Sequence, residues 1–178
     1  MEKIYGATER HDQLLVFGTN RAVLIYGYGE ENGQGYDYRH VFNHHPSPDE
    51  IREIIVSQID ANTDAKILTG YQWTVLHGDL TKPEENRHVG ETVSVWLNTE
   101  NQSNYKEAHR LACLDASKVV PVKFKISQDS KKNAIYETFE TFDELNAFYM
   151  GAFAFIKNVL DDGWDEKDNI DLTKFGYE

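Results

Sequence analysis

The longest amphipathic pattern in the chain runs from Thr141 to Asp162. Its apolar residues recur at helical spacing on one continuous face: Phe142, Leu145, Phe148, Tyr149, Ala152, Phe153, Ile156 and Leu160. A second, thinner stripe widens that face: Ala147, Gly151, Phe155 and Val159. Thr141 and Glu144 have the spacing of a capping box, and Gly163 is typical of a left-handed helix stop. We therefore predict a helix over 141–162 that is central to the core or lies partly in a subunit interface, and the pattern leaves both alternatives open.

Strands dominate the N-terminal third of the pattern. Three runs are rich in β-branched and aromatic residues: Leu14–Phe17, Ala22–Tyr28 and Tyr36–Phe42. A turn at 18–21 makes a hairpin of the first two. In the second run, Leu24, Tyr26 and Tyr28 should share one side, because side chains alternate along a strand. The segment Gly29–Gly35 is rich in Gly, Glu and Asn, which favours an exposed loop.

A helix is predicted after these strands. Ser47, Pro48, Asp49 and Glu50 form a second capping-box pattern with proline at the first helical position. The buried stripe then consists of isoleucines at positions 51, 54, 55 and 59. This helix is expected to fray near Asn62, with one further turn that ends at Gly70.

Two strand–strand–helix units follow in tandem. Half-buried strands are predicted around Tyr71–Val75 and Val93–Leu97, with the long polar loop His77–Gly90 between them. Asn98 or Thr99 should cap the next helix, with Gln102 completing a third box after Thr99. Further strands are expected over 120–126 and 135–139, before the helix of 141–162.

This order predicts an α+β fold in which antiparallel hairpins carry helices packed on one face. We expect a strand-rich region over 1–65 that ends in a helix, and a second domain over 66–178. Both could pack as a single globular unit.

Composition excludes several classes of function. The 178 residues carry a net charge of −12, which argues against binding a nucleic-acid backbone or an anionic membrane surface. The single cysteine, Cys113, excludes an internal disulfide and a cysteine zinc cage. The first residues lack the apolar run of a signal peptide, and no stretch approaches the length of a membrane span. We expect a soluble protein of the host cytoplasm, or a virion-associated one, that is not secreted by a signal peptide.

Four segments resemble the landmarks of a domain family of unknown function. They are Leu97–Lys106 (LNTENQSNYK), Pro121–Lys125 (PVKFK), Phe142–Tyr149 (FDELNAFY) and Gly163–Asp168 (GWDEKD). The similarity covers about Lys66–Asp171. The family recurs in phages and prophages of Bacteroides-type gut bacteria, often near tail and tail-fibre proteins. The resemblance implies a phage context and a protein partner, and it brings no catalytic residue or cofactor. The loop His77–Gly90 is longer than the turn expected of the family.

Three clusters could carry chemistry, but each has a simpler explanation. His40, His44 and His45, with Asp37 and Asp49 nearby, are ligand types that suit zinc, yet adjacent histidines on an extended chain point in opposite directions. His109 and Cys113 lie four residues apart on one predicted helix and could touch, but no oxyanion site accompanies them. An acidic run lacks the spacing of a calcium loop: Asp161, Asp162, Asp165, Glu166 and Asp168. We therefore predict no catalytic residue, metal site or cofactor.

The tyrosines around the Gly-rich segment are the candidate interaction residues. They are Tyr26, Tyr28, Tyr36 and Tyr38. Tyrosine, glycine and asparagine supply stacking area and adaptable hydrogen bonds in binding loops. The alternative is that these tyrosines pack as ordinary strand residues.

The leading hypothesis is a non-enzymatic phage- or prophage-derived accessory or structural protein, associated with tails or tail fibres, that has a protein partner. It rests on the resemblance and on the lack of a catalytic constellation. Two alternatives are a module that binds carbohydrate or a cell surface through the tyrosines, and an acidic decoy of host nucleic-acid-binding proteins. Self-association is compatible with the broad apolar arc of 141–162.

Overall fold

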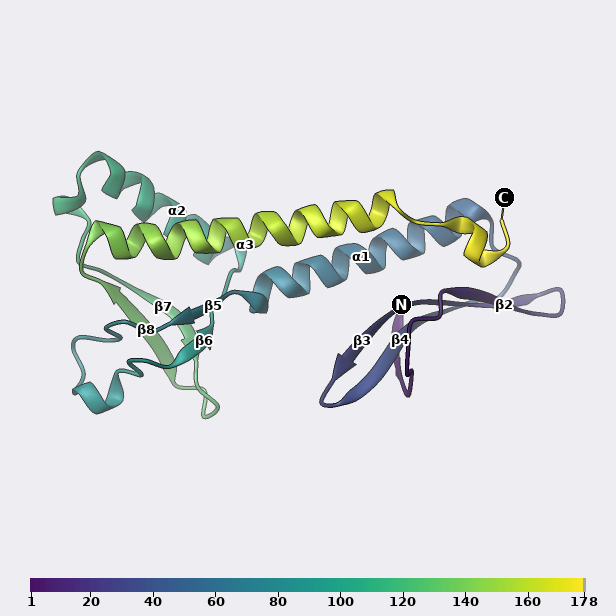
Figure 1. Ribbon diagram of the computed structural model, residues 1–178, viewed down its shortest axis with the longest axis horizontal. Helices are drawn as coiled ribbons and strands as arrows, with labels where there is room; N and C mark the ends of the chain where they lie inside the picture. Colours follow the sequence, from purple (N-terminus) through teal and green to yellow (C-terminus); the bar gives the residue numbers. More distant parts are fainter. Residues whose placement is uncertain (178) are drawn as a thin grey trace. The chain divides into compact units, whose positions relative to one another are not determined.

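The computed structural model describes residues 1–177. Within them the chain forms three α-helices, one four-stranded antiparallel sheet and two antiparallel hairpins, with the helices packed together and against the strands (Figure 1). The predicted α+β class is confirmed. Two compact units emerge: Met1–Asn62 together with the segment that begins at Gly163, and Thr63–Asp162. Each unit has its own hydrophobic core.

The first unit is a sheet covered on one face. Its strands are β1 (Glu2–Tyr5), β2 (Gln13–Phe17), β3 (Arg21–Glu31) and β4 (Gln34–Phe42), in the order β1-β4-β3-β2. Alternation brings Ala22, Leu24 and Tyr26 of β3 to one face, where they meet the isoleucines of α1 (Pro48–Gly70). The short 3₁₀ helix η3 (Leu172–Phe175) adds Phe175 to the same core. Strand β1 was not predicted, because its four residues are too few to show a pattern.

A β-bulge changes the side assignment within β3. Tyr26 pairs with Tyr38 and Gly29 pairs with Tyr36, so two residues of β3 stand opposite one residue of β4. The expectation that Tyr28 shares a side with Leu24 and Tyr26 is therefore wrong, since the extra residue turns Tyr28 to the opposite face. The predicted loop over 29–35 is also shorter than expected. The hairpin closes at Asn32 and Gly33, whose φ values of 52° and 76° are typical of a type I′ turn.

Helix α1 starts as predicted but does not fray. The Ser47 amide donates to Glu50 at 2.7 Å, and the Glu50 amide donates to the Ser47 hydroxyl at 3.2 Å, which confirms the capping box. The helix runs unbroken to Gly70. The side chain of Gln58 donates to that of Asn62 at 2.9 Å, so the residue expected to end the helix is held within it.

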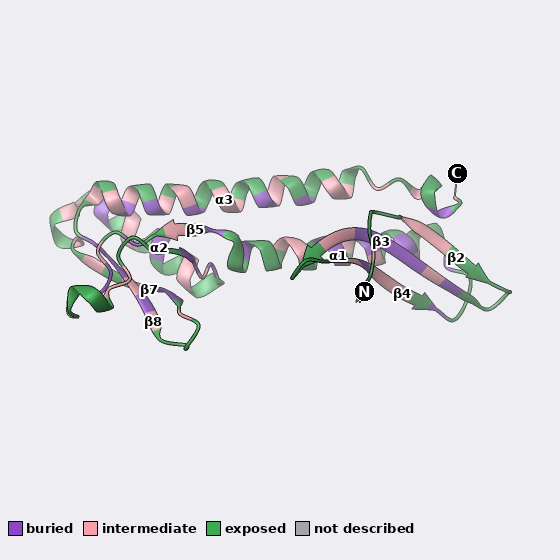
Figure 2. Ribbon diagram, turned by 60° about the horizontal axis from the view of Figure 1, so that its bottom comes forward, coloured by how far each residue is buried: buried purple, intermediate pink, exposed green. Residues whose placement is uncertain are grey.

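The second unit contains both hairpins. Strands β5 (Gln72–Thr74) and β6 (Thr92–Ser94) form one, and β7 (Val122–Gln128) and β8 (Ala134–Phe139) form the other. The Trp96 amide donates to the Ile126 carbonyl at 2.9 Å and joins them. Each hairpin is followed by a helix, α2 (Thr99–Leu114) and then α3 (Phe142–Asp168), which confirms the tandem order. Burial alternates along these elements (Figure 2), with Phe139, Leu145 and Phe148 fully enclosed.

The caps of α2 and α3 agree only in part with the prediction. The Thr141–Glu144 box is confirmed by hydrogen bonds of 3.1 and 3.3 Å. Helix α3 nevertheless passes through Gly163, which is buried and helical, and ends at Asp168. At α2 the cap is Asn98, whose side chain accepts from the Asn101 amide at 2.8 Å. The expected box at Thr99 does not form, because Gln102 donates to the Leu97 carbonyl instead.

No helix within residues 1–177 is both long and apolar enough to cross a membrane.

Candidate binding groove

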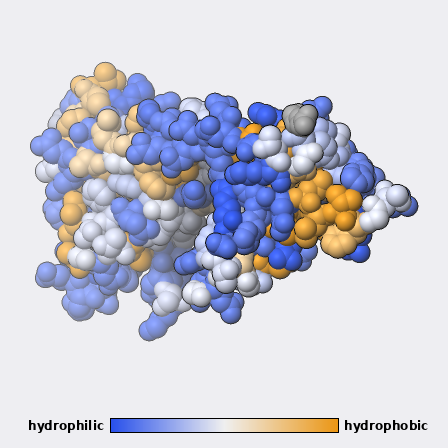
Figure 3. Space-filling model, turned by 45° about the vertical axis from the view of Figure 1, so that its right-hand side comes forward, coloured by the Kyte–Doolittle hydropathy of each residue, from blue (hydrophilic) through white to orange (hydrophobic). Residues whose placement is uncertain are grey.

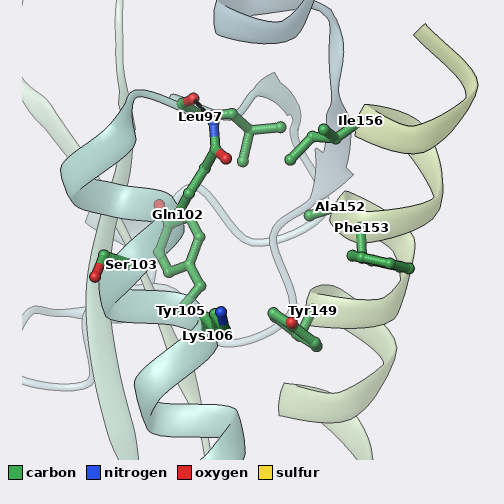
Figure 4. Close-up of a pocket in the computed structure, with 9 residues that line it drawn as sticks. All are labelled: Leu97, Gln102, Ser103, Tyr105, Lys106, Tyr149, Ala152, Phe153 and Ile156. Atoms are coloured by element: carbon green, nitrogen blue, oxygen red, sulfur yellow. Dashed lines mark hydrogen bonds between the residues drawn. The ribbon is translucent and has the colours of Figure 1, made fainter. Parts of the chain in front are cut away.

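An apolar groove lies between α2 and α3 in the second unit. It has a volume of about 410 Å³ and is lined by Leu97, Gln102, Ser103, Tyr105, Lys106, Tyr149, Ala152, Phe153 and Ile156. Figure 4 shows side chains of the two helices facing each other across it. The helices run antiparallel here, since Leu97 at the start of α2 lies near Ile156, and His109 further along contacts Tyr149.

The helical spacing of α3 creates the groove. Tyr149, Ala152, Phe153 and Ile156 lie on one side of the helix because they are three or four positions apart. Ala152 is buried but small, and it therefore leaves room between its larger neighbours. Phe153 was predicted to belong to the buried face, yet it is mostly exposed. Part of the predicted apolar arc thus lines this groove.

Two polar groups border this apolar surface. Tyr105 is almost fully buried, and its hydroxyl is without a hydrogen-bond partner among residues 1–177. Burial raises the pKa of Tyr105, so it stays a neutral hydroxyl. Lys106 is exposed, and within the described chain no carboxylate pairs with its ammonium group. The groove can therefore receive apolar side chains, with a cation at its rim.

The four candidate tyrosines lie in the first unit and do not form one surface. Tyr26 is buried in the core and donates to Glu166 at 2.7 Å. Burial, with the Glu166 hydrogen bond, raises the pKa of Tyr26. Tyr36 and Tyr38 contact each other edge to face at 5.5 Å between ring centroids. Tyr28 lies on the opposite face, where its hydroxyl donates to Glu30 at 2.8 Å.

Glycines make room for two of these rings. A Cβ atom at Gly29 would lie 2.3 Å from the Tyr36 hydroxyl, and one at Gly35 would lie 2.9 Å from the Tyr28 ring. Sequence reasoning missed Tyr5, whose ring contacts that of Tyr36 at 5.8 Å. It belongs to the unpredicted strand β1, whose four residues give no pattern that could have indicated it.

The histidines of β4 and of the segment before α1 make local contacts. His44 Nε2 lies 2.8 Å from Glu50, and the His40 ring packs edge-on against Phe42 at 4.6 Å. Among residues 1–177 no group of three or more His, Cys, Asp or Glu side chains is placed to hold a metal ion.

His109 and Cys113 touch, as their spacing predicted. The sulfur lies 3.9 Å from the ring nitrogens of His109. His109 is also held by Asn146, at 2.9 Å, and is stacked on Tyr149 at 4.2 Å. The histidine thus has a packing role on the α2–α3 contact. In the acidic run, Asp161 pairs with Lys157 and Glu166 accepts from Tyr26, so these two carboxylates have separate partners.

A polar pocket of about 330 Å³ in the first unit contains charges that satisfy each other. Arg10 Nε donates to both oxygens of Asp12, at 2.8 and 3.1 Å. The Gly27 amide also donates to Asp12, at 2.8 Å, and Lys174 lies 3.8 Å from it. This network fastens the segment before β2 to η3.

Glu137 of β8 holds the start of the long loop between β5 and β6 in place. This carboxylate is fully buried and accepts from Trp73 Nε1 at 2.9 Å and from the amides of Leu76, His77 and Gly78 at 2.6 to 3.1 Å. Further along, Asp79 accepts from the Thr81 hydroxyl at 2.7 Å. That hydrogen bond, with a smaller contribution from Lys123, lowers the pKa of Asp79 to about 2. The start of the loop is therefore fixed, and sequence reasoning gave no role to Glu137.

Comparison of the chain with protein-family models, with curated proteins and with solved structures gives no match. The resemblance to the phage-associated family stays a prediction.

Proposed function

We propose that this chain is a non-enzymatic accessory protein of phage or prophage origin, associated with tails or tail fibres, that binds a protein partner through the α2–α3 groove. The groove supports the binding role, because it exposes the aromatic ring of Phe153 beside a buried apolar floor. Buried aromatic anchors commonly dominate protein interfaces. The phage setting rests on the family resemblance alone.

The chemistry of the groove favours an amphipathic helix as its occupant. Two antiparallel helices present a groove into which apolar side chains at helical spacing fit. Lys106 at the rim pairs with an acidic residue of that helix. Because Lys106 is exposed, we assign it to partner choice and association rate more than to affinity.

The test compares two neighbours on α3 of nearly equal exposure. Phe153 is 53% exposed and lines the groove, whereas Met150 is 48% exposed and does not line it. Tagged wild-type protein should enrich tail, fibre or baseplate proteins from a phage-induced lysate. Phe153→Asp should lower that enrichment by about tenfold or more, and Met150→Asp should not. Equal enrichment by all three proteins would refute the groove, and enrichment of host nucleic-acid-binding proteins would favour the acidic decoy.

The assembly role needs a separate experiment. Deletion of the gene should leave intact capsids without infectious tails, seen by electron microscopy and plaque assay. Infectious, tailed particles from the deletion strain would end the tail hypothesis even if the groove binds a protein.

A second candidate function, carbohydrate or cell-surface binding, has one observation in its favour. Tyr5, Tyr36 and Tyr38 form a contiguous aromatic row, with the Lys3 ammonium 4.1 Å from the centre of the Tyr36 ring. On a glycan array, Tyr36→Ala should lose signal, while Tyr28→Ala should retain it because Tyr28 lies on the other face. An array without wild-type signal would count against this function.

A further inference from the structure

The four-stranded sheet of the first unit ends in two edge strands, β1 and β2. Each edge strand leaves a row of backbone amide and carbonyl groups without a partner strand in the sheet. Such edges pair with other chains unless charge, proline or a covering segment prevents it. The two edges of this sheet differ in the charge that they carry.

Strand β1 carries charge and β2 does not. The four residues of β1 include Glu2 and Lys3, and Lys3 forms an ion pair with Glu31 at 3.1 Å. The five residues of β2 are QLLVF, without a charged residue, proline or glycine. In a chain of net charge −12, this is a locally neutral and apolar edge.

The outer part of β2 is exposed. Leu15, Val16 and Phe17 are 37%, 46% and 55% exposed, and Leu14 packs only partly against the core (Figure 2). The residues opposite Leu15 continue an apolar surface across the sheet, because Leu15 pairs with Val23 and Val23 pairs with Val41. The space-filling view shows one of the apolar patches of the surface towards its right-hand side (Figure 3). Strand β2 thus combines an uncharged edge with exposed apolar side chains.

We propose that β2 is a self-association edge, on which β2 of a second copy pairs antiparallel and continues the sheet through the dimer. A second copy fits this edge because the strand is complementary to itself. Antiparallel pairing about Leu15 places Leu15 against Leu15, Leu14 against Val16, and Gln13 against Phe17. No like charges meet. A two-fold dimer of this kind is the commonest closed assembly.

Electrostatics predicts how the dimer responds to salt. Two chains of charge −12 repel each other at long range, while the contact itself is neutral. Added salt screens that repulsion and should therefore strengthen association. An interface of opposite charges would weaken with salt, so the sign of the effect discriminates between the two.

The experiment measures the dimer dissociation constant of the full chain by sedimentation. Leu15→Lys should raise it by roughly tenfold or more, because two lysines would lie opposite each other at the edge. Phe17→Lys, at the most exposed position of β2, is the second edge variant. Val41→Lys is the matched control, since Val41 is 48% exposed on the same face but belongs to β4. Circular dichroism verifies that each variant is folded.

The outcomes are distinct. Edge pairing is supported if both β2 variants lose the dimer while Val41→Lys keeps the dissociation constant of the wild type. A wild-type chain that is monomeric at every concentration overturns it, and so does equal loss in Val41→Lys, which would mean face-to-face packing. Phe153→Asp should dimerise normally, so failure of this proposal is separate from failure of the groove.

Cross-linking tests the register. In a Cys113→Ser background, Leu15→Cys should form a disulfide-linked dimer on mild oxidation, because directly opposed Cβ atoms in an antiparallel pair lie about 5 Å apart. Val41→Cys should not. Cross-linking of both positions, or of Val41→Cys alone, would contradict the proposed pairing.

Discussion

At the scale of single residues, Glu137 shows how one buried charge can organise a loop. A carboxylate without exposure is costly unless donors surround it. Here the Trp73 indole and the amides of residues 76–78 all donate to it, and the Thr138 amide donates at 3.1 Å. Charge-assisted bonds of this kind are stronger than neutral ones. The loop can thus be long and polar while its first residues are held in place.

Replacing that carboxylate by an amide should be strongly destabilising. Glu137→Gln keeps the shape but turns one acceptor oxygen into a donor that faces other donors, so we expect a loss of about 2–4 kcal/mol in the free energy of unfolding. Urea denaturation measures it. Glu140→Gln, at an exposed carboxylate, should change little. If both substitutions changed the free energy of unfolding equally, the hydrogen bonds to Glu137 would not contribute the expected stability.

The pair of His77 and Glu144 should make stability depend on pH. The hydrogen bond to Glu144, at 3.0 Å, raises the pKa of His77 above 6.5. Burial pushes the pKa of Glu144 up, but hydrogen bonds from His77 and from the Thr141 and Glu140 amides outweigh it, so that this pKa lies below 4.5.

The sign of each shift sets the pH window. The His77 contribution is fully present below pH 6.5 and is lost as pH rises through its raised pKa, whereas the Glu144 contribution is present above pH 4.5 and is lost as pH falls. The stability difference between wild type and His77→Gln should therefore be largest between pH 4.5 and 6.5. His45→Gln, at an exposed histidine, is the control. A difference independent of pH would refute the ion pair.

At the scale of elements, Gly151 shows how a glycine within a helix can serve close packing. Gly151 lies in the middle of α3, where alanine would ordinarily favour the helix by about 1 kcal/mol. A Cβ atom there would lie 2.5 Å from the Tyr71 hydroxyl, which itself donates to the Phe148 carbonyl at 3.2 Å. Tyr71 is buried and cannot move aside freely.

A double-mutant cycle tests this contact. We expect Gly151→Ala to destabilise the protein by about 1–3 kcal/mol, through overpacking. Tyr71→Phe alone should cost about 1 kcal/mol for its lost hydrogen bond. Together they should cost less than the sum, because the phenylalanine ring lacks the clashing oxygen. Strict additivity in urea denaturation would mean that the helices relax to accommodate the methyl group.

At the scale of the whole molecule, the chain builds two cores from segments that are not contiguous. The core of the first unit combines β3 and the first part of α1 with Phe175, near the end of the described chain, while α1 adds Ile67 to the core of the second unit. Gly176, at φ 85°, closes the turn that brings Phe175 inward. The C-terminal segment is therefore part of the N-terminal unit.

Phe175→Ala should loosen only one of the two units. Removing a buried phenylalanine costs about 3 kcal/mol or more. Amide hydrogen exchange should accelerate within 1–62, and it should stay unchanged within 63–162 because that core lacks Phe175. Phe153→Ala, at an exposed ring, is the control and should change neither region. Uniform acceleration along the chain would show that the units unfold as one.

The sequence alone determined the fold class, the order of elements and most helix starts. Capping boxes at Ser47 and Thr141 are local signals, since donor and acceptor lie three residues apart, and both form as predicted. Alternation and helical spacing are local in the same way. The candidate site could be predicted only in part. The apolar spacing of α3 was evident from the sequence, but the sequence did not indicate which of these apolar residues would line an open groove.

Only the tertiary structure decided the remaining features, because they depend on partners distant in the sequence. Helix α3 passes Gly163 where the local signal predicted a stop, and Glu166 beyond it accepts from Tyr26 of β3. The bulge that separates Tyr28 from Tyr26 exists only in the pairing of β3 with β4. Glu137 resembles any polar strand residue until the loop folds over it, and Phe153 resembles a core residue until α2 is in place. Local patterns fix an element and its faces, whereas burial is fixed by what packs against it.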